Sequence, residues 1–339
     1  MRVKLEDVCE RGSSNIKQSD IIKMSGNYPI YGASGLAGKV NFYHQEQPYV
    51  AVVKDGAGIG RTTLNPAKSS VIGTMQYLIP KKNVLPEYLF YVVSYMHLEK
   101  YYTGATIPHI YFKDYKNEEF NLDNIEKQLE IIDVLGRCKK VIEARKQELV
   151  ELDSLTKARF VELFGDPVAN PMHWPVKRLK ELAIQINSGN TPKGGSENYV
   201  EKGITFFRSQ NVWKDRLEMD DIAYIDEKTH ESMKRSSLKH GDILMTKTGR
   251  INTENSSLGR AALYEGEDDM ANVNGHVYFI RLKEGVNNKF VLRVLVSPEY
   301  RDLIRSVCVG GIDKRQLNKE HIEEFPIIYP PSEMIDNYI

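Results

Sequence analysis

The 339-residue chain is poor in several features that would assign it to a particular class of protein. Its three cysteines, Cys9, Cys138 and Cys308, are widely spaced and form no Cys-x-x-Cys pair, so they indicate neither a disulfide framework nor a zinc site. No run of about 18 apolar residues is present, and the N-terminus lacks the apolar core of a signal peptide. We therefore expect a cytoplasmic protein with reduced thiols.

A net charge is also lacking, because 46 Lys and Arg residues balance 46 Asp and Glu residues. A neutral chain is not coated in basic charge, but local basic patches on a neutral surface can still bind nucleic acid. The content of 41% hydrophobic and 27% charged residues is that of a globular protein, and the length predicts two domains.

What the chain does contain is an internal repeat whose two copies match in order and spacing but differ in most residues. Each copy has an apolar run that breaks into a Gly-rich or basic loop, at 49–62 and at 240–260. In each copy two further segments follow at similar spacing: 70–82 and 86–122 in the first, 271–284 and 288–331 in the second. Two diverged copies indicate one kind of task performed on two different targets.

The repeat predicts an α+β fold with two β-rich domains in tandem. Short β-rich runs alternate with loops in each copy, which favours a mixed, mostly antiparallel sheet with flanking helices. One helix is expected near the end of each copy, at 86–101 and at 288–305.

A long helix is predicted between the copies, from Asn124 to about Phe164, since this stretch has no proline and is rich in helix formers. Asp123 or Asn124 can cap its start, and Gly165 ends it. About 40 residues at 1.5 Å each give about 60 Å. Residues at alternating steps of three and four form a heptad seam that needs a partner helix. Its apolar members are Leu135, Ile142, Leu149, Leu152 and Leu163. The alternative is a long surface helix that packs on one domain.

The end of the second copy has the pattern of another helix start, because Pro330, Pro331 and Ser332 precede Glu333 and Met334. Repetition predicts a second long helix that would continue beyond Ile339, antiparallel to the first, so we expect that the chain is truncated. The expected divisions are a first recognition-type domain at 1–122, a spacer helix at 123–165, a second recognition-type domain at 166–331 and the start of a second spacer helix at 332–339.

The layout resembles the specificity subunit of Type I restriction–modification systems. VKLEDV at 3–8 matches PVKRLKELA at 175–183, and LFGDP at 163–167 stands at the end of the helix. INSGNTPKGG at 186–195 resembles the start of many target-recognition domains of that family. Three segments of the first copy resemble another common type of target-recognition domain. Those segments are YPIYGASGLAG at 28–38, KDGAGIGR at 54–61 and GTMQYLIP at 73–80. The departure from the family is the missing second helix.

The resemblance implies that each domain reads one half of a bipartite, asymmetric site in double-stranded DNA. The helices would fix the spacing of the half-sites and dock two modification subunits, which would methylate adenine with S-adenosylmethionine. Restriction subunits would add translocation and cleavage that use ATP and Mg. This chain itself would bind no cofactor and no metal, and the exposed helix seam could also pair with a second copy of the chain.

The residues themselves also favour a non-catalytic role. The Pro-Pro pair at 330–331 lacks the amide or acid before it and the aromatic after it that amino-methyltransferases carry. DGAGIG at 55–60 has Arg61 where a dinucleotide loop needs its third glycine. The alternative function is a non-DNA scaffold with two protein-binding modules on a helical spacer. The salt dependence of binding distinguishes the two functions, because contacts to DNA phosphates weaken steeply as the salt concentration rises, whereas a protein–protein contact of mixed polarity weakens far less.

Candidate DNA contacts are cations that can reach phosphates, and forked or amide side chains that can read base edges. The loops 54–61 and 247–260 are the strongest candidates, because the repeat brings their cations to equivalent places. The candidates in the first copy are Lys54, Arg61, Gln76 and His109. Those in the second copy are Lys193, Arg208, Gln210, Asn211, Lys247, Arg250, Arg260 and Asn274.

Overall fold

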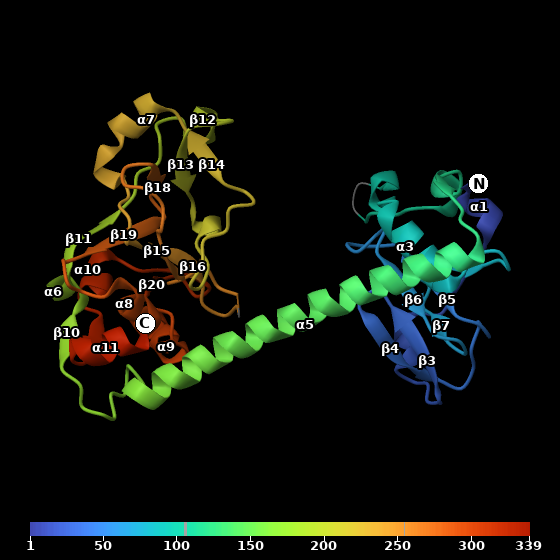
Figure 1. The fold of residues 1–339 in the computed structure, drawn as a ribbon, viewed down its shortest axis with the longest axis horizontal. Coiled ribbons are helices and arrows are strands. Elements are labelled where there is room, and N and C mark those ends of the chain that lie inside the picture. The colour runs from blue at the N-terminus through green and yellow to red at the C-terminus, as the bar shows by residue number, and fades with distance from the viewer. Residues whose placement is uncertain (105–106, 254) are drawn as a thin grey trace. The chain divides into compact units, whose positions relative to one another are not determined.

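The computed structural model of the chain describes residues 1–104, 107–253 and 255–339. These residues form two compact units, 1–148 and 149–339, and the long helix α5 (Ile125–Phe164) begins in the first unit and ends in the second (Figure 1). Within the described ranges, no helix is long and apolar enough to cross a membrane.

The first unit is organised around a four-stranded antiparallel sheet of order β2-β8-β5-β6. A second sheet of order β4-β3-β7 contains one parallel pair, β3 with β7, and β1 pairs with β9. The strands are β1 (Arg2–Lys4), β2 (Cys9–Ser13), β3 (Tyr28–Gly32), β4 (Gly35–Val40), β5 (Tyr49–Val53), β6 (Thr62–Asn65), β7 (Ser70–Val71), β8 (Met75–Pro80) and β9 (Glu119–Asn121). The helices are α1 (Leu5–Val8), α2 (Gln18–Ile21), α3 (Pro86–Tyr95), the 3₁₀-helix η1 (Leu98–Tyr101) and α4 (Phe112–Tyr115).

The second unit repeats this plan in the same chain order. Its main sheet is antiparallel with the order β11-β19-β15-β17, β13 and β18 are the parallel pair of a neighbouring sheet, and β10 pairs with β22. The strands are β10 (Val176–Arg178), β11 (Ala183–Ser188), β12 (Tyr199–Val200), β13 (Ile204–Phe207), β14 (Ala223–Ile225), β15 (Ile243–Thr246), β16 (Thr248–Arg250), β17 (Ala261–Leu263), β18 (Ala271–Val273), β19 (Val277–Leu282), β20 (Val309–Gly310), β21 (Lys314–Gln316) and β22 (Pro326–Ile328). The helices are α6 (Leu179–Leu182), η2 (Gly195–Asn198), η3 (Ser209–Asn211), α7 (Glu227–Ser232), η4 (Lys234–Ser236), α8 (Asn288–Leu295), α9 (Pro298–Val307), α10 (Lys319–Glu323) and α11 (Ser332–Tyr338). The predicted α+β fold of two tandem copies is confirmed.

Each main sheet has a central strand that is buried on both faces. In β5, Val50 and Val52 face the core that includes α3, whereas Ala51 and Val53 face a second core with β3 and β4. Strand side chains alternate between the two faces of a sheet, so a strand between two cores must be apolar at every position. This is why 49–53 reads as an uninterrupted apolar run.

The single helix predicted near the end of each copy is a pair of helices in the structure. In the first unit α3 ends at Tyr95, and His97 takes a left-handed conformation (φ 52°) before η1 begins. In the second unit α8 ends at Leu295 and α9 begins at Pro298, whose ring cannot continue the preceding helix. Ser297 caps α9 by accepting a hydrogen bond from the Tyr300 N–H (3.3 Å).

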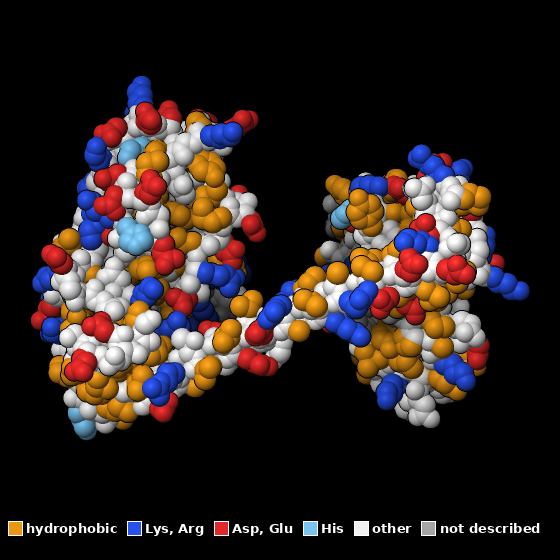
Figure 2. Space-filling view, viewed as in Figure 1, with side chains coloured by type: hydrophobic (Ala, Val, Ile, Leu, Met, Phe, Trp, Pro, Cys, Tyr) orange, Lys and Arg blue, Asp and Glu red, His pale blue; other side chains and the backbone are white. Residues whose placement is uncertain are grey.

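The long helix α5 is confirmed at both of its predicted ends. The Asn124 side chain caps it by accepting a hydrogen bond from the Lys127 N–H (2.9 Å), and Gly165 adopts φ +76° just beyond Phe164. Of the predicted seam, Leu163 packs against the core of the second unit. The other four apolar members are exposed (Leu149 by 67%), and Figure 2 shows hydrophobic side chains along the visible face of α5. These four are Leu135, Ile142, Leu149 and Leu152.

Phe164 anchors the end of α5 in the second unit, where its ring meets the ring of Phe290 with centroids 5.1 Å apart. We expect Phe164→Ala to lower the free energy of unfolding of this unit by about 3–5 kcal/mol, because it leaves a cavity in a packed core. The matched control is Leu155→Ala on the same helix, where Leu155 is exposed and the expected change is within about 0.5 kcal/mol. Denaturant unfolding measures both, and equal losses would contradict the anchoring role.

Candidate nucleic-acid interface

The two loops that follow the central strands are held by the same backbone hydrogen bonds. The Lys54 N–H donates to the Thr74 carbonyl (2.9 Å), and the Lys54 carbonyl accepts from the Ile110 N–H (2.9 Å). In the second unit the Lys247 N–H donates to the His276 carbonyl (2.8 Å), and the Lys247 carbonyl accepts from the Leu317 N–H (2.9 Å). Lys54 and Lys247 therefore occupy equivalent backbone positions.

The ends of the two loops are equivalent in the same way. The Val53 N–H donates to the Arg61 carbonyl (2.9 Å), and the Gly60 N–H donates to the Val53 carbonyl (2.9 Å). The matching bonds run from the Thr246 N–H to the Arg260 carbonyl (2.9 Å) and from the Gly259 N–H to the Thr246 carbonyl (3.1 Å). One scaffold thus presents a lysine and an arginine at the same two points in each unit.

The side chains at these points have different surroundings in the first unit. Lys54 forms an ion pair with Asp55, which also lies 2.7 Å from the Nδ1 of His109. The lysine charge is therefore partly balanced, and Lys54 and His109 form one cluster through this carboxylate. Arg61 is exposed and donates from Nη1 to the Ala33 carbonyl (3.0 Å), which leaves the rest of its guanidinium facing solvent.

In the second unit the equivalent arginine is buried and the lysine is half-buried. Arg260 is 9% exposed, donates from Nε to the Ser256 carbonyl (2.9 Å) and lies over the ring of Trp213 at 3.9 Å. Burial, followed by the charge of Arg301, lowers the pKa of its guanidinium from the usual value, although an arginine stays protonated. Lys247 lies over the Tyr278 ring at 5.7 Å. The backbone that the two units share thus presents different side-chain surroundings in each unit.

A polar pocket of about 390 Å³ brings together three of the predicted residues, Gln210, Arg250 and Arg260. Gln210 and Arg250 are exposed: the first donates to the Asp221 carboxylate (3.1 Å) and the second lies 3.3 Å from the Asp313 carboxylate. The remaining wall consists of hydroxyl and amide side chains: Ser209, Thr253, Asn255, Ser256 and Ser257. Amides and guanidinium groups of this kind read adenine and guanine edges in the major groove.

Besides Arg260, two predicted residues are buried, and both use their amides to hold the backbone. Gln76 lies in β8 and its amide donates to the Gly12 carbonyl of β2. Asn211 donates to the carbonyls of Glu218 (3.1 Å) and Asp221 (2.9 Å), so it holds the loop in place. Amides in a polar segment look alike in sequence whether they hold a loop or face solvent, and only burial separates them.

The other three predicted residues do not line the polar pocket. Lys193 is exposed, and its carbonyl accepts a hydrogen bond from Asn198 (2.8 Å). Asn274 is half-buried and accepts from the His276 N–H (3.0 Å). Arg208 is half-buried and forms an ion pair with Asp221 (3.1 Å) beside Gln210.

The sequence interpretation missed four cations that lie together with Arg260. They line a pocket of about 320 Å³ that shares Ser256 and Arg260 with the polar pocket. The missed residues are Lys157, Lys214, Arg301 and Arg305. Arg301 and Arg305 stand four residues apart in α9, and residues at this spacing lie on one face of a helix. That spacing was a signal available in the sequence.

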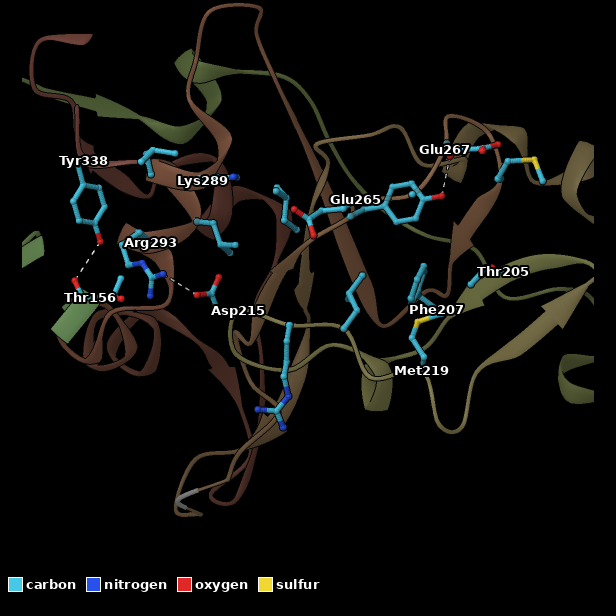
Figure 3. A pocket seen from close by; sticks show the side chains of 18 of the residues that line it. Thr156, Thr205, Phe207, Asp215, Met219, Glu265, Glu267, Lys289, Arg293 and Tyr338 are labelled. Carbon is cyan, nitrogen blue, oxygen red and sulfur yellow. Dashed lines mark hydrogen bonds and ion pairs between the residues drawn. The ribbon is translucent and has the colours of Figure 1, made fainter. Parts of the chain in front are cut away.

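Another pocket of the second unit, of about 810 Å³, contains none of the predicted residues (Figure 3). Arg293 and Asp215 form an ion pair there (3.0 Å), and the Tyr338 hydroxyl donates to the Thr156 carbonyl (3.3 Å). Desolvation raises the pKa of Asp215, while Arg293 acts in the opposite direction. The pocket mixes this ion pair with apolar side chains such as Phe207. No group of three or more His, Cys, Asp or Glu side chains that could hold a metal occurs among the residues described.

Comparison with known proteins places the chain beside one family. The model of the "Type I restriction modification DNA specificity domain" matches residues 1–153 and 171–336. The "Type I restriction enzyme MjaIX specificity subunit" of Methanocaldococcus jannaschii is 27% identical over 193 residues, which cover 51% of this chain and 44% of that protein. The match therefore spans less than half of the relative's length. The crystal structure of a Type-I restriction-modification system S subunit from M. genitalium aligns over 100% of this chain and 87% of that one, with a TM-score of 0.58 and 16% identity. At this identity the likeness concerns the fold.

The neighbouring residues Gln210 and Asn211 provide a matched test of exposed against buried amides. We expect Asn211→Ala to reduce the free energy of unfolding by about 1–3 kcal/mol, because it leaves buried backbone groups without partners. Gln210→Ala should change it by less than about 0.5 kcal/mol, since Gln210 is exposed. Thermal or denaturant unfolding of the two variants checks this, and a reversed order would refute the assignment of roles.

Proposed function

Because the chain belongs to the family of Type I restriction modification DNA specificity domains, with both of its copies matched, we propose that it recognises a bipartite, asymmetric DNA site and that each unit reads one half. The observation that carries this proposal is the equivalence of Lys54 with Lys247 and of Arg61 with Arg260 on one backbone scaffold. The same scaffold with different loop chemistry suits one task performed on two different sequences.

In the second unit, the polar pocket supplies the groups for base readout. Gln210 can pair with adenine and Arg250 with guanine, and both are exposed. In the first unit, Arg61 is the exposed cation, and Lys54 with His109 forms a second polar cluster around Asp55. Phosphate contacts from the cations would position the duplex, and the amide and guanidinium groups would specify it.

The chain would act in the cytoplasm without chemistry of its own. Two modification subunits would methylate adenine with S-adenosylmethionine, and restriction subunits would use ATP and Mg for translocation and cleavage. The exposed apolar residues of α5 support a docking role for this helix, since Leu135, Ile142, Leu149 and Leu152 form a stripe that another helix can cover.

The test is to express the chain with the modification subunit encoded beside it and to sequence the methylated DNA of the host. We expect a split, asymmetric motif with methylated adenines that appears only when this chain is present. A stable complex that produces no motif would count against DNA recognition and favour a protein-binding scaffold. The salt dependence of binding gives a second test, because binding that weakens steeply with salt supports contacts to DNA phosphates over a protein-binding scaffold.

Removal of one heptad from α5 tests whether the helix sets the spacing. Deletion of residues 139–145 removes about 10.5 Å of helix, equivalent to about three base pairs of duplex. We expect the gap between the methylated half-sites to shorten by about that amount while both half-site sequences persist. The control replaces the same seven residues with other helix formers and should keep the gap. An altered half-site sequence with an unchanged gap would exclude the spacer role.

A further inference from the structure

Five cationic side chains surround one pocket of about 320 Å³ in the second unit. They come from four separate segments of the chain: Lys157 from α5, Lys214 from the loop after η3, Arg260 from the residue before β17, and Arg301 with Arg305 from α9. Among the residues that the structure describes, Asp302 is the carboxylate in the wall; its side chain is 78% exposed and lies 3.3 Å from Arg305.

The scaffold holds Arg260 through neutral partners, which leave its charge in place. Its guanidinium donates from Nε to the Ser256 carbonyl (2.9 Å) and also donates to the Asn255 carbonyl. Lys157 is balanced by Asp153 at 2.5 Å, whereas Lys214 forms no ion pair with any residue that the structure describes. More positive than negative charge therefore faces the pocket.

The free protein carries an electrostatic cost at this point. Partial desolvation, and then the charges of Arg301, Lys157, Arg260 and Arg305, lower the pKa of Lys214 from its ordinary value. A bound anion would remove this repulsion. The arrangement is costly for folding alone, and such costs are typical of residues retained for binding.

The position of the pocket indicates which anion it takes. It shares Ser256 and Arg260 with the polar pocket that holds Gln210 and Arg250. Phosphates border the grooves in which base edges are read, so a phosphate site directly beside a base-reading site matches the geometry of a duplex. A free small anion would need no such neighbour.

We infer that this five-cation pocket binds a backbone phosphate of the DNA half-site read by the second unit, with Lys214, Arg301 and Arg305 as sequence-independent contacts. This inference rests on the proposed function and adds to it the division of labour within the second unit. The cationic pocket positions the duplex, and Gln210 and Arg250 specify it.

The experiment uses the full chain in complex with its modification subunit, and duplexes with and without the methylated motif. Lys214→Gln removes the charge and keeps a polar side chain, Lys214→Arg keeps the charge, and Arg250→Ala removes a base-reading group. Lys228→Gln on α7, which is exposed and lies at the far end of the unit from α9 (Figure 1), is the matched control. Fluorescence anisotropy at several salt concentrations gives affinities, and thermal unfolding of the full chain gives stability.

We expect Lys214→Gln to weaken binding to both duplexes alike, by about three- to tenfold, and to reduce the salt slope by about one. Lys214→Arg should restore both quantities, and Lys228→Gln should change neither. Arg250→Ala should instead weaken binding to the motif duplex selectively. Lys214→Gln should also raise the midpoint of thermal unfolding at low salt, because it removes like-charge repulsion.

Three results would overturn the inference. A wild-type complex that binds neither duplex at low salt removes the proposed function and the phosphate site with it. A wild-type complex that binds, with Lys214→Gln equal to Lys228→Gln, removes the phosphate site alone. Inorganic phosphate that stabilises the wild type but not Lys214→Gln, without any effect of this substitution on DNA binding, would make the pocket a small-anion site.

Discussion

In both units a central strand with two buried faces carries the loop on which the candidate interface depends. In β15, Ile243 and Met245 pack into the core that includes α8 and α9, and Leu244 packs into a second core with β18 and β19. A shift of the strand by one residue would exchange these two faces, so burial on both sides fixes the register strongly. Because the register is fixed, the residues just beyond the strand are fixed as well.

The consequence is a scaffold that tolerates change in its loops. The backbone hydrogen bonds that hold Lys54 and Lys247 are the same, yet the next residue is Asp55 in one unit and Thr248 in the other. The carboxylate balances the first lysine and contacts His109, while the second lysine lies against an aromatic ring. Two copies can therefore share a fold and present different chemistry, as reading two different half-sites requires.

The helix α5 serves the two units differently along its length. At its start, the buried Gln128 donates to the Asn83 carbonyl (3.0 Å), and at its end Phe160 and Phe164 enter the core of the second unit. Between these anchors the apolar residues Ile142 and Leu149 are exposed. Helix formers and salt bridges such as Arg137 with Asp133 (2.8 Å) stabilise the exposed part without tertiary packing.

The sequence by itself determined the repeat, the long helix with its ends, and the family, because these depend on local patterns such as apolar runs, Asn124 as a cap and Gly165 as a stop. It also predicted that the lysine and the arginine of one loop are equivalent to those of the other, because aligned residues of a repeat occupy equivalent positions in the two copies. Only the tertiary structure decided that Gln76 and Asn211 are buried and that Lys157, Lys214, Arg301 and Arg305 meet Arg260. Burial and convergence depend on contacts between segments far apart in the chain, and such contacts leave no periodic signal in any one of the segments.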